Sequence, residues 1–287
     1  MIRETGLFPY VGSDGKVIDF ILRNLPNAKT FVEVFGGSGV VTLAVARRGM
    51  YEEIIWNDAD ELIYSAFYVV KEWGSVGYAV SDFVSWAKKF LKSPEGRRTL
   101  KEFLISIRDQ LVRGEINNIY EKGFWVLILH HCFLQPFQSV PPFYLNTLLR
   151  SAVFRLDKPA TREGLMSAYR ERHLLLRRVK LMNMDGFKLI REMDRRDVIM
   201  YLDPPHVGYD YYRMNFTVRD AVRLANEVCR VRKAKVLVKL SYEDLPYYEC
   251  LRRGWKSSEV GYRVSEPHSR RYSYYVFFRN YEPRRWW

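Results

Sequence analysis

The chain has 287 residues, of which 48% are hydrophobic and 15% aromatic, so it can bury a sizeable core and does not resemble a disordered protein. Its formal net charge of +13 favours an acidic polymer as partner, and nucleic acid is the commonest of these. No apolar run is long enough for a transmembrane helix, the start lacks a signal pattern, and three scattered cysteines favour a reducing compartment. We therefore expect a cytoplasmic protein with no membrane partner.

The first part of the chain alternates between strands and helices. A short helix is expected over residues 14–25, then a strand over 30–35 that stops at a glycine-rich turn, then a helix over 40–47. A strand over 53–56 and a helix over 59–72 follow. Together they form one βαβ unit, which requires parallel strands joined by a right-handed crossover.

The middle of the chain has a different pattern. Helical spacing dominates over residues 78–91, 100–112 and 120–133, and a proline-rich loop and an Arg/Lys-rich region follow at 135–144 and 150–180. The loop and the basic region are the candidates for reading a nucleic-acid sequence. We therefore divide the chain into a catalytic domain of residues 1–74 and 176–287 and a helical target-recognition insertion of residues 75–175.

Alternation of strands and helices returns in the last part of the chain. Strands are expected over 179–182, 198–202 and 235–240, helices after Asp185 and over 217–231, and a C-terminal hairpin from strands over 257–264 and 272–279. The expected fold class is therefore α/β, a Rossmann-like sheet with a C-terminal antiparallel hairpin and a helical insertion.

Two polar segments follow the first two strands, where a parallel sheet binds its ligands. The glycines of Gly36-Gly37-Ser38-Gly39 allow a close approach of backbone to ligand, or serve the turn alone. Asp58 can accept both hydroxyls of a ribose, or can be the N-cap of the next helix. Because these glycines are not followed by the Gly-Lys-Ser/Thr of a phosphate-binding loop, a nucleoside without phosphates, such as S-adenosylmethionine, fits best.

The segment Asp203-Pro204-Pro205-His206 follows the most apolar strand. Two prolines fix φ and remove two backbone donors, so the corner presents acceptors only, namely the Asp203 carboxylate and the Pro204 carbonyl. Two adjacent acceptors suit an exocyclic NH2 group, whose nitrogen could attack a methyl sulfonium in line. The alternative is a tight turn with a structural aspartate.

In this linear order the motifs resemble those of the Dam-like class of DNA adenine-N6 methyltransferases. The resemblance covers about residues 1–72 and 179–279, and its motifs are FPYVGSDGK at 8–16, FVEVFGGSGVV at 31–41, WND at 56–58, YLDPPH at 201–206 and KVLVKLSYED at 235–244. It implies site-specific transfer of a methyl group from S-adenosylmethionine to N6 of adenine in duplex DNA, with the base flipped out. A cognate restriction endonuclease is a candidate partner.

The resemblance also implies a role for each matching residue. The expected catalytic residues are Asp203, Pro204, Pro205 and His206, and no metal is expected because the adjacent His130, His131 and Cys132 cannot easily share one ion. The expected cofactor-binding residues are Tyr10, Lys16, Glu33, Phe35, Gly36, Gly37, Ser38, Gly39, Asp58, Asp185 and Asp203.

Two departures from the family pattern keep other functions open. The family usually has Tyr where this chain has His206, and Ser13-Asp14 replace the glycines before Lys16. An imidazole can stack on a flipped base, or it can simply pack against its neighbours; Tyr209, Tyr211 and Tyr212 can support the base or pack their own loop. The alternatives are an N4-cytosine or RNA-base methyltransferase, since the corner recognises only an amine, and a nucleic-acid-binding relative without catalysis.

Overall fold

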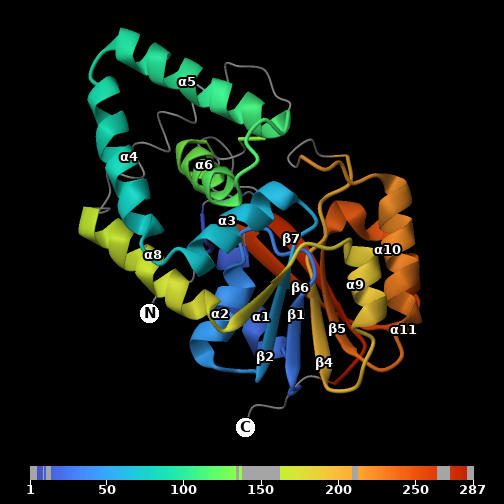
Figure 1. The fold of residues 1–287 in the computed structure, drawn as a ribbon. Coiled ribbons are helices and arrows are strands. Elements are labelled where there is room, and N and C mark those ends of the chain that lie inside the picture. The colour runs from blue at the N-terminus through green and yellow to red at the C-terminus, as the bar shows by residue number, and fades with distance from the viewer. Residues whose placement is uncertain are drawn as a thin grey trace.

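The computed structural model describes residues 5–8, 10, 14–133, 136–137, 162–208, 213–263 and 272–282. Within these ranges seven strands form one sheet in the order β3-β2-β1-β4-β5-β7-β6, with helices on both faces (Figure 1). The first five strands of this order are mutually parallel, whereas β7 is antiparallel to both β5 and β6. The predicted fold class, including the C-terminal antiparallel pair, is confirmed.

The strands lie close to where the apolar runs predict them. Every residue of β1 and β4 is buried, which agrees with the unbroken apolar run of β4. The bounds are β1 (Thr30–Glu33), β2 (Glu53–Asn57), β3 (Val179–Met182), β4 (Val198–Leu202), β5 (Lys235–Ser241), β6 (Lys256–Arg263) and β7 (Tyr272–Arg279).

Within the described ranges helices cover both faces of the sheet, and an apolar cluster is buried on each side. On one face lie α1 (Ile18–Asn24), α2 (Val40–Arg48) and α3 (Glu61–Glu72), preceded by the 3-10 turn η1 (Asp14–Lys16). On the other face lie α9 (Gly186–Glu192), α10 (Val218–Arg230) and α11 (Glu249–Gly254), the last preceded by the 3-10 helix η2 (Tyr242–Tyr248) (Figure 1). Thr217 and Asp220 form a capping box that fixes where α10 begins.

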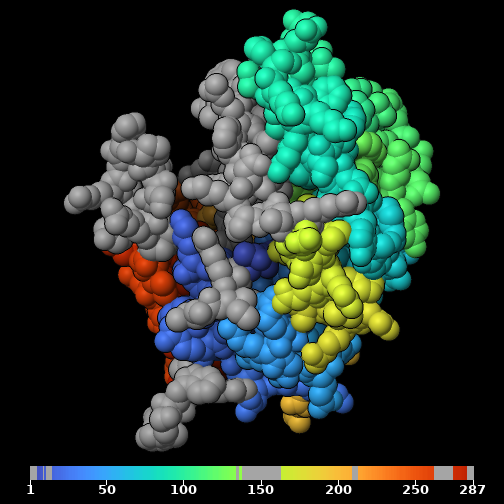
Figure 2. Space-filling model, turned by 90° about the vertical axis from the view of Figure 1, so that its left-hand side faces the viewer, coloured from blue at the N-terminus to red at the C-terminus, as the bar shows by residue number. Residues whose placement is uncertain are grey.

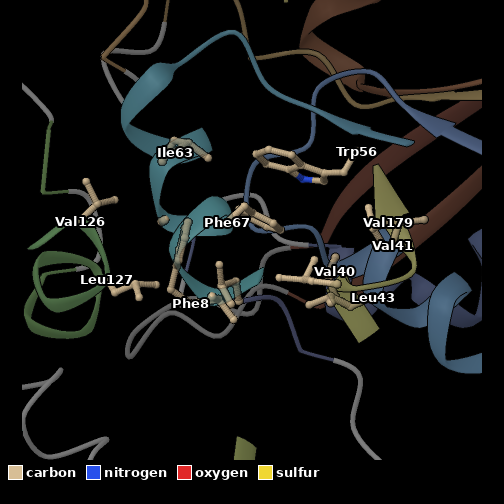
Figure 3. Close-up of a cluster of buried hydrophobic side chains, with 14 of the residues drawn as sticks. Phe8, Val40, Val41, Leu43, Trp56, Ile63, Phe67, Val126, Leu127 and Val179 are labelled. Atoms are coloured by element: carbon tan, nitrogen blue, oxygen red, sulfur yellow. The ribbon is translucent and has the colours of Figure 1, made fainter. Parts of the chain in front are cut away.

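The predicted helical insertion contains α4 (Val76–Phe90), α5 (Pro94–Val112), α6 (Ile119–Cys132) and α8 (Arg162–Leu176). Helices α4 and α5 extend away from the sheet, whereas α8 lies against α2 (Figures 1 and 2). Figure 3 shows that the core continues from Trp56 and Phe67 to Val126 and Leu127 of α6. The apolar core therefore crosses the predicted boundary near residue 75, and the division into two domains stays a prediction.

Several predicted features lie outside the described residues. These are the central part of the N-terminal motif, most of the proline-rich loop 135–144, the first part of the basic region 150–180, and the tyrosines Tyr209, Tyr211 and Tyr212.

A disulfide joins Cys229 of α10 to Cys250 of α11, while Cys132 is a buried free thiol. The scattered spacing of the cysteines, which favours a reducing compartment, did not indicate this pair. Cytosolic disulfides are rare in mesophiles but are frequent in hyperthermophiles. The bond ties α10 to α11, the helix that precedes β6.

Breaking this disulfide is expected to lower the stability of the fold. For a sequence separation of 21 residues, loop-closure entropy corresponds to a loss of about 3 kcal/mol in the free energy of unfolding. Urea unfolding of the wild type with and without reductant measures it, and a Cys229→Ser/Cys250→Ser variant should show no response to reductant. An equal midpoint for oxidised and reduced wild type would contradict the expectation.

Candidate active site

The strand order reverses between β1 and β4, and open α/β sheets bind ligands at the carboxyl ends of the strands beside such a reversal. A cavity of about 300 Å³ lies there. It is lined by Tyr10, Glu33, Phe35, Gly36, Gly37, Ser38, Val40, Asp58, Ala59, Asp60, Asp185, Gly186, Phe187, Asp203, Pro204, Pro205, His206, Arg213, Met214, Asn215, Phe216, Asp220 and Arg223.

This cavity brings together most of the residues that the sequence predicts. The four catalytic residues and nine of the expected cofactor residues are in its lining. Lys16 and Gly39 are not: Lys16 is exposed in η1, and Gly39 is the N-cap of α2 with a left-handed φ of 67°. A contact of these two residues with the cofactor stays a prediction.

The glycine loop between β1 and α2 is packed too tightly for side chains. A Cβ on Gly36 would overlap the indole Nε1 of Trp56, and Gly37 has a left-handed φ of 47°. The amide of Gly36 donates to the carbonyl of Asn57 at 2.8 Å, which ties the loop to the end of β2. The loop backbone of Gly36 and Gly37 thus forms part of the cavity wall itself.

Asp58 braces the glycine loop from the end of β2. Its Oδ2 accepts the amide of Gly37 and its Oδ1 accepts the amide of Asp60, both at 2.9 Å. Helix α3 begins at Glu61 with Asp60 as its N-cap, so the N-cap interpretation of Asp58 is wrong. Burial, reinforced by the charge of Asp60 and opposed by the two backbone hydrogen bonds, raises the pKa of Asp58 to about 7.

The raised pKa of Asp58 gives the fold a pH dependence of known sign. The folded protein holds a proton here that the unfolded chain releases near its ordinary pKa, so this stabilisation is present at low pH and lost as pH rises through about 7. We expect the unfolding free energy of the wild type, relative to Asp58→Asn, to fall between about pH 4 and about pH 7 by at most about 4 kcal/mol. Urea titrations at each pH measure this difference. If the free energy of unfolding depended on pH in the same way in both proteins, the expectation would be contradicted.

Asp60 joins the two walls of the cavity, which the sequence analysis missed. Its carboxylate caps Leu62 and also accepts two hydrogen bonds from Arg213 in a bidentate arrangement, from Nε to Oδ2 at 3.1 Å and from Nη2 to Oδ1 at 2.8 Å. Arg213 belongs to the segment that follows the catalytic corner. The pair therefore connects that segment to the start of α3 across the cavity.

Two predicted cofactor residues also serve the fold. Glu33 is buried, and its Oε2 accepts the amide of Thr42 at 3.0 Å near the N-terminus of α2. Asp185 is the N-cap of α9, where its Oδ1 accepts the amide of Lys188 at 2.8 Å. Both carboxylates are thus held in fixed orientations at the edge of the cavity.

The corner Asp203-Pro204-Pro205-His206, which is expected to be catalytic, follows β4, and β5 supports it from one side. The Oδ2 of Asp203 accepts a hydrogen bond from the Nζ of Lys239 at 2.8 Å. The side chain of Lys239 is only 1% exposed, against 23% for Asp203. The carboxylate is therefore paired with a buried cation at the cavity wall.

A second contact supports the other end of the corner. The Nδ1 of His206 lies 2.9 Å from the Oδ2 of Asp244, which also accepts the hydroxyl of Ser241 at 2.8 Å. Although burial opposes it, hydrogen bonding from His206 and Ser241 holds the pKa of Asp244 below its ordinary value. An ionised Asp244 requires a proton on Nδ1, so the contact fixes both the tautomer and the orientation of the ring.

The cavity fits a nucleoside cofactor such as S-adenosylmethionine. Its volume is at the lower end of the range for small-molecule sites, and one wall is aromatic, with Phe35 edge-on to Phe216 at 6.5 Å. The guanidinium of Arg223 lies 4.2 Å from the ring centroid of Phe187 in the same lining. The lining also contains carboxylates that can accept hydrogen bonds from hydroxyl groups. At Gly36 and Gly37 the backbone carries no side chain, so a ligand can approach it closely.

Among the described residues no cluster of His, Cys, Asp and Glu could hold a metal ion. His131 binds the hydroxyl of Tyr169 at 2.6 Å, and burial lowers its pKa to about 4. In the same part of the chain, no helix is both long and apolar enough to cross a membrane.

The glycine loop with its acidic brace and the segment Asp203-Pro204-Pro205-His206 thus lie in one cavity at the carboxyl ends of a doubly wound sheet. The chain belongs to the D12 class N6 adenine-specific DNA methyltransferases, whose family model matches residues 10–265. It is therefore an enzyme that uses S-adenosylmethionine to methylate N6 of adenine in DNA, and the predicted activity, cofactor and DNA substrate are confirmed.

Two individual proteins are similar to the chain. It is 24% identical over 278 residues to the Type II methyltransferase M.MjaIII of Methanocaldococcus jannaschii. The matched region covers 88% of this chain and 89% of that protein. Among solved structures it is similar to SMU.1697c of Streptococcus mutans in complex with SAH, with 6% identity, a TM-score of 0.36, and coverage of 92% and 95% of the two chains.

Proposed function

We propose that residues 203–206 form the site of methyl transfer, with the Asp203 carboxylate and the Pro204 carbonyl receiving the two hydrogens of the adenine N6 amino group. The observation that carries this proposal is that Asp203 and Pro204 line the same cavity as Gly36, Gly37 and Asp58. The cofactor, when bound, supplies a methyl group on a positively charged sulfur. The corner then holds the amine in line with that group.

Asp203 contributes charge as well as position. The amino nitrogen would become positive as its bond to the methyl group forms and the bond from methyl to sulfur breaks, until one of its hydrogens leaves as a proton. A fixed carboxylate stabilises this developing charge without reorganising. Pro204 and Pro205 contribute by what they lack, because no backbone N–H at these positions competes for the nitrogen lone pair. No residue of the corner needs to form a covalent bond.

For the cofactor, we propose that Asp58 receives the ribose hydroxyls and that the aromatic wall of Phe35, Phe187 and Phe216 contacts the adenine ring. The two oxygens of Asp58 each accept one backbone amide, which leaves acceptor capacity on both. Its ionised form is the better acceptor. Cofactor binding is therefore expected to release a proton near pH 7, which calorimetry in buffers of different ionisation enthalpy measures.

We further propose that the target adenine leaves the duplex and stacks on His206. A paired adenine cannot reach a corner that lines a cavity, and the ring of His206 is held by Asp244 in a single orientation. Placing 2-aminopurine at the target position tests this, because its fluorescence should rise on binding. Unchanged fluorescence in a tight complex would contradict flipping.

The relative from Methanocaldococcus jannaschii is named a Type II methyltransferase, which supports a role beside a restriction endonuclease. We infer that this protein methylates one short sequence and protects it from such a partner. Long-read mapping of methylated adenines in plasmid DNA modified by the protein tests the inference. A single sequence context supports it, and methylation in every context would rule out a protective role.

One experiment tests the activity itself and its assignment to the corner. The protein is incubated with DNA and isotopically labelled S-adenosylmethionine, and the digested nucleosides are identified by mass spectrometry. The expected product is N6-methyladenine from the wild type and little or none from an Asp203 variant. Full product from that variant would show that the chemistry lies elsewhere.

A further inference from the structure

Lys239 is a buried lysine in the middle of β5. Its side chain is 1% exposed, while its strand neighbours Val238 and Leu240 are apolar and buried. A buried ammonium loses its hydration and costs several kcal/mol unless a partner compensates it. A leucine would pack at this position without that cost, so the fold alone does not call for a lysine.

The register of the sheet explains which partner Lys239 has. Strands β4 and β5 are parallel, with Tyr201 beside Leu237 and Leu202 beside Val238. One step further along both strands brings Asp203 beside Lys239, and alternation puts both side chains on the face of Tyr201 and Leu237. The ion pair of 2.8 Å is therefore built into the pairing of the two strands.

The ammonium is held from a second side as well. It lies 4.0 Å from the ring centroid of Tyr275 on β7, which pairs with β5 on its other edge. The aromatic face attracts the cation and leaves it little room to move. Lys239 is thus fixed between the catalytic carboxylate and an aromatic ring of the adjacent strand.

We propose that Lys239 is a positioning residue for methyl transfer: its ammonium holds Oδ2 of Asp203, so that Oδ1 and the Pro204 carbonyl form the fixed pair of acceptors for the adenine amino group. The inference rests on the proposed role of the corner. It assigns to β5 the task of setting the orientation of the Asp203 carboxylate, which otherwise rotates about its Cβ–Cγ bond.

A purely structural lysine predicts something different. Its removal would lower stability and reduce the amount of active enzyme. The enzyme that remains would still prefer a base with an N6 amino group to one with a hydrogen atom in its place. A positioning lysine predicts a selective loss of amine capture. The difference is measured with the complex of the enzyme and S-adenosylhomocysteine, which needs no turnover.

The test compares binding to two oligonucleotides that contain the mapped target site, one with adenine and one with purine at the target position. Purine lacks the N6 amino group, so the ratio of the two dissociation constants reports capture by the corner. We expect adenine to bind the wild-type complex about tenfold or more tightly than purine. In Lys239→Met this preference should fall to about twofold or less, with kcat about 100-fold lower and S-adenosylhomocysteine affinity within about threefold.

Lys239→Gln and Lys235→Met complete the set. Glutamine keeps a neutral donor for Asp203 and should restore part of the adenine preference. Lys235 is on the same strand at its far end, where its Nζ donates to the carbonyl of Asn27, so its replacement should change neither preference nor kcat. Thermal unfolding establishes that each variant is folded, and Lys239→Gln serves for the comparison if the methionine variant is not.

The outcomes separate this inference from the proposed function. If Asp203→Asn loses kcat and adenine preference but a folded Lys239 variant keeps both, the positioning role is wrong and the corner stands. If Asp203→Asn also keeps its kcat and its preference for adenine, the proposed role of the corner is wrong as well. If neither Lys239 variant folds, Lys239 serves the fold and the proposal is overturned.

Discussion

Replacing Asp203 by asparagine is expected to lower kcat for DNA methylation by about 10²–10³-fold, the range found when one preorganised electrostatic group is removed from an active site. Asparagine keeps the shape of the side chain and one carbonyl oxygen. It loses the charge that opposes the positive charge growing on N6, and its own NH2 group cannot accept the hydrogens of the amine. Affinity for the cofactor should change by less than about tenfold, because the glycine loop and Asp58 remain.

Asparagine is a cleaner substitution here than alanine. Alanine would leave the Lys239 ammonium buried without its carboxylate, and a broken buried pair costs about 3–5 kcal/mol. The carbonyl of asparagine can still accept from Lys239, so the folded population is retained. Single-turnover assays with saturating DNA and cofactor measure the effect, and Asp19→Asn on the exposed face of α1 is the matched control. A folded Asp203→Asn protein with wild-type turnover would remove the corner from the mechanism.

The parts of the site that the sequence predicts are those encoded by adjacent residues. Gly36-Gly37-Ser38-Gly39 follows β1 and Asp203-Pro204-Pro205 follows β4, so each motif carries its own structural context. Parallel strands place their carboxyl ends together, and this alone brings the two motifs into one cavity. The order of elements and most of the fold were predictable for the same reason.

The parts that the sequence did not reveal depend on pairings between distant residues. The contacts of Asp203 with Lys239 and of His206 with Asp244 span 36 and 38 residues. The first follows from the β4–β5 register, whereas the second joins segments beyond the ends of these two strands. A lysine within an apolar strand was the available signal, because buried lysines need a partner. The N-cap of α3 is Asp60, whereas the sequence analysis considered only Asp58 for that position, two residues earlier.

Local pattern also failed between β5 and β6. The segment of η2 and α11 mixes tyrosines, acids and Pro246, and it shows no clear helical period, so no element was predicted there. This segment nevertheless supplies Asp244, which supports His206, and Cys250, which pairs with Cys229. Tertiary packing determines its structure where periodicity does not.

Replacing Gly36 by alanine is the second large expected effect, with a loss of cofactor affinity of about 5–150-fold, the equivalent of the 1–3 kcal/mol typical of overpacking. The new Cβ would overlap the indole of Trp56, which is fully buried and stacked on Phe67 with ring centroids 3.8 Å apart. Because neither ring has space to withdraw, the loop must move instead. That movement displaces Gly37 from Asp58, whose 2.9 Å hydrogen bond shapes the cavity wall.

A compensating substitution distinguishes this cause from a general effect of alanine in the loop. Trp56→Phe removes the Nε1 atom that the Cβ would meet, so the double variant should recover affinity relative to Gly36→Ala alone. Gly254→Ala, where a Cβ would meet nothing within 4 Å, should bind the cofactor like the wild type. Calorimetry of cofactor binding to the wild type, Gly36→Ala, Trp56→Phe and the double variant gives the coupling energy between the two positions. This energy is expected to be about 1 kcal/mol or more for residues in direct contact. Strictly additive losses would mean that the packing of Trp56 against Gly36 does not control the shape of the cofactor loop.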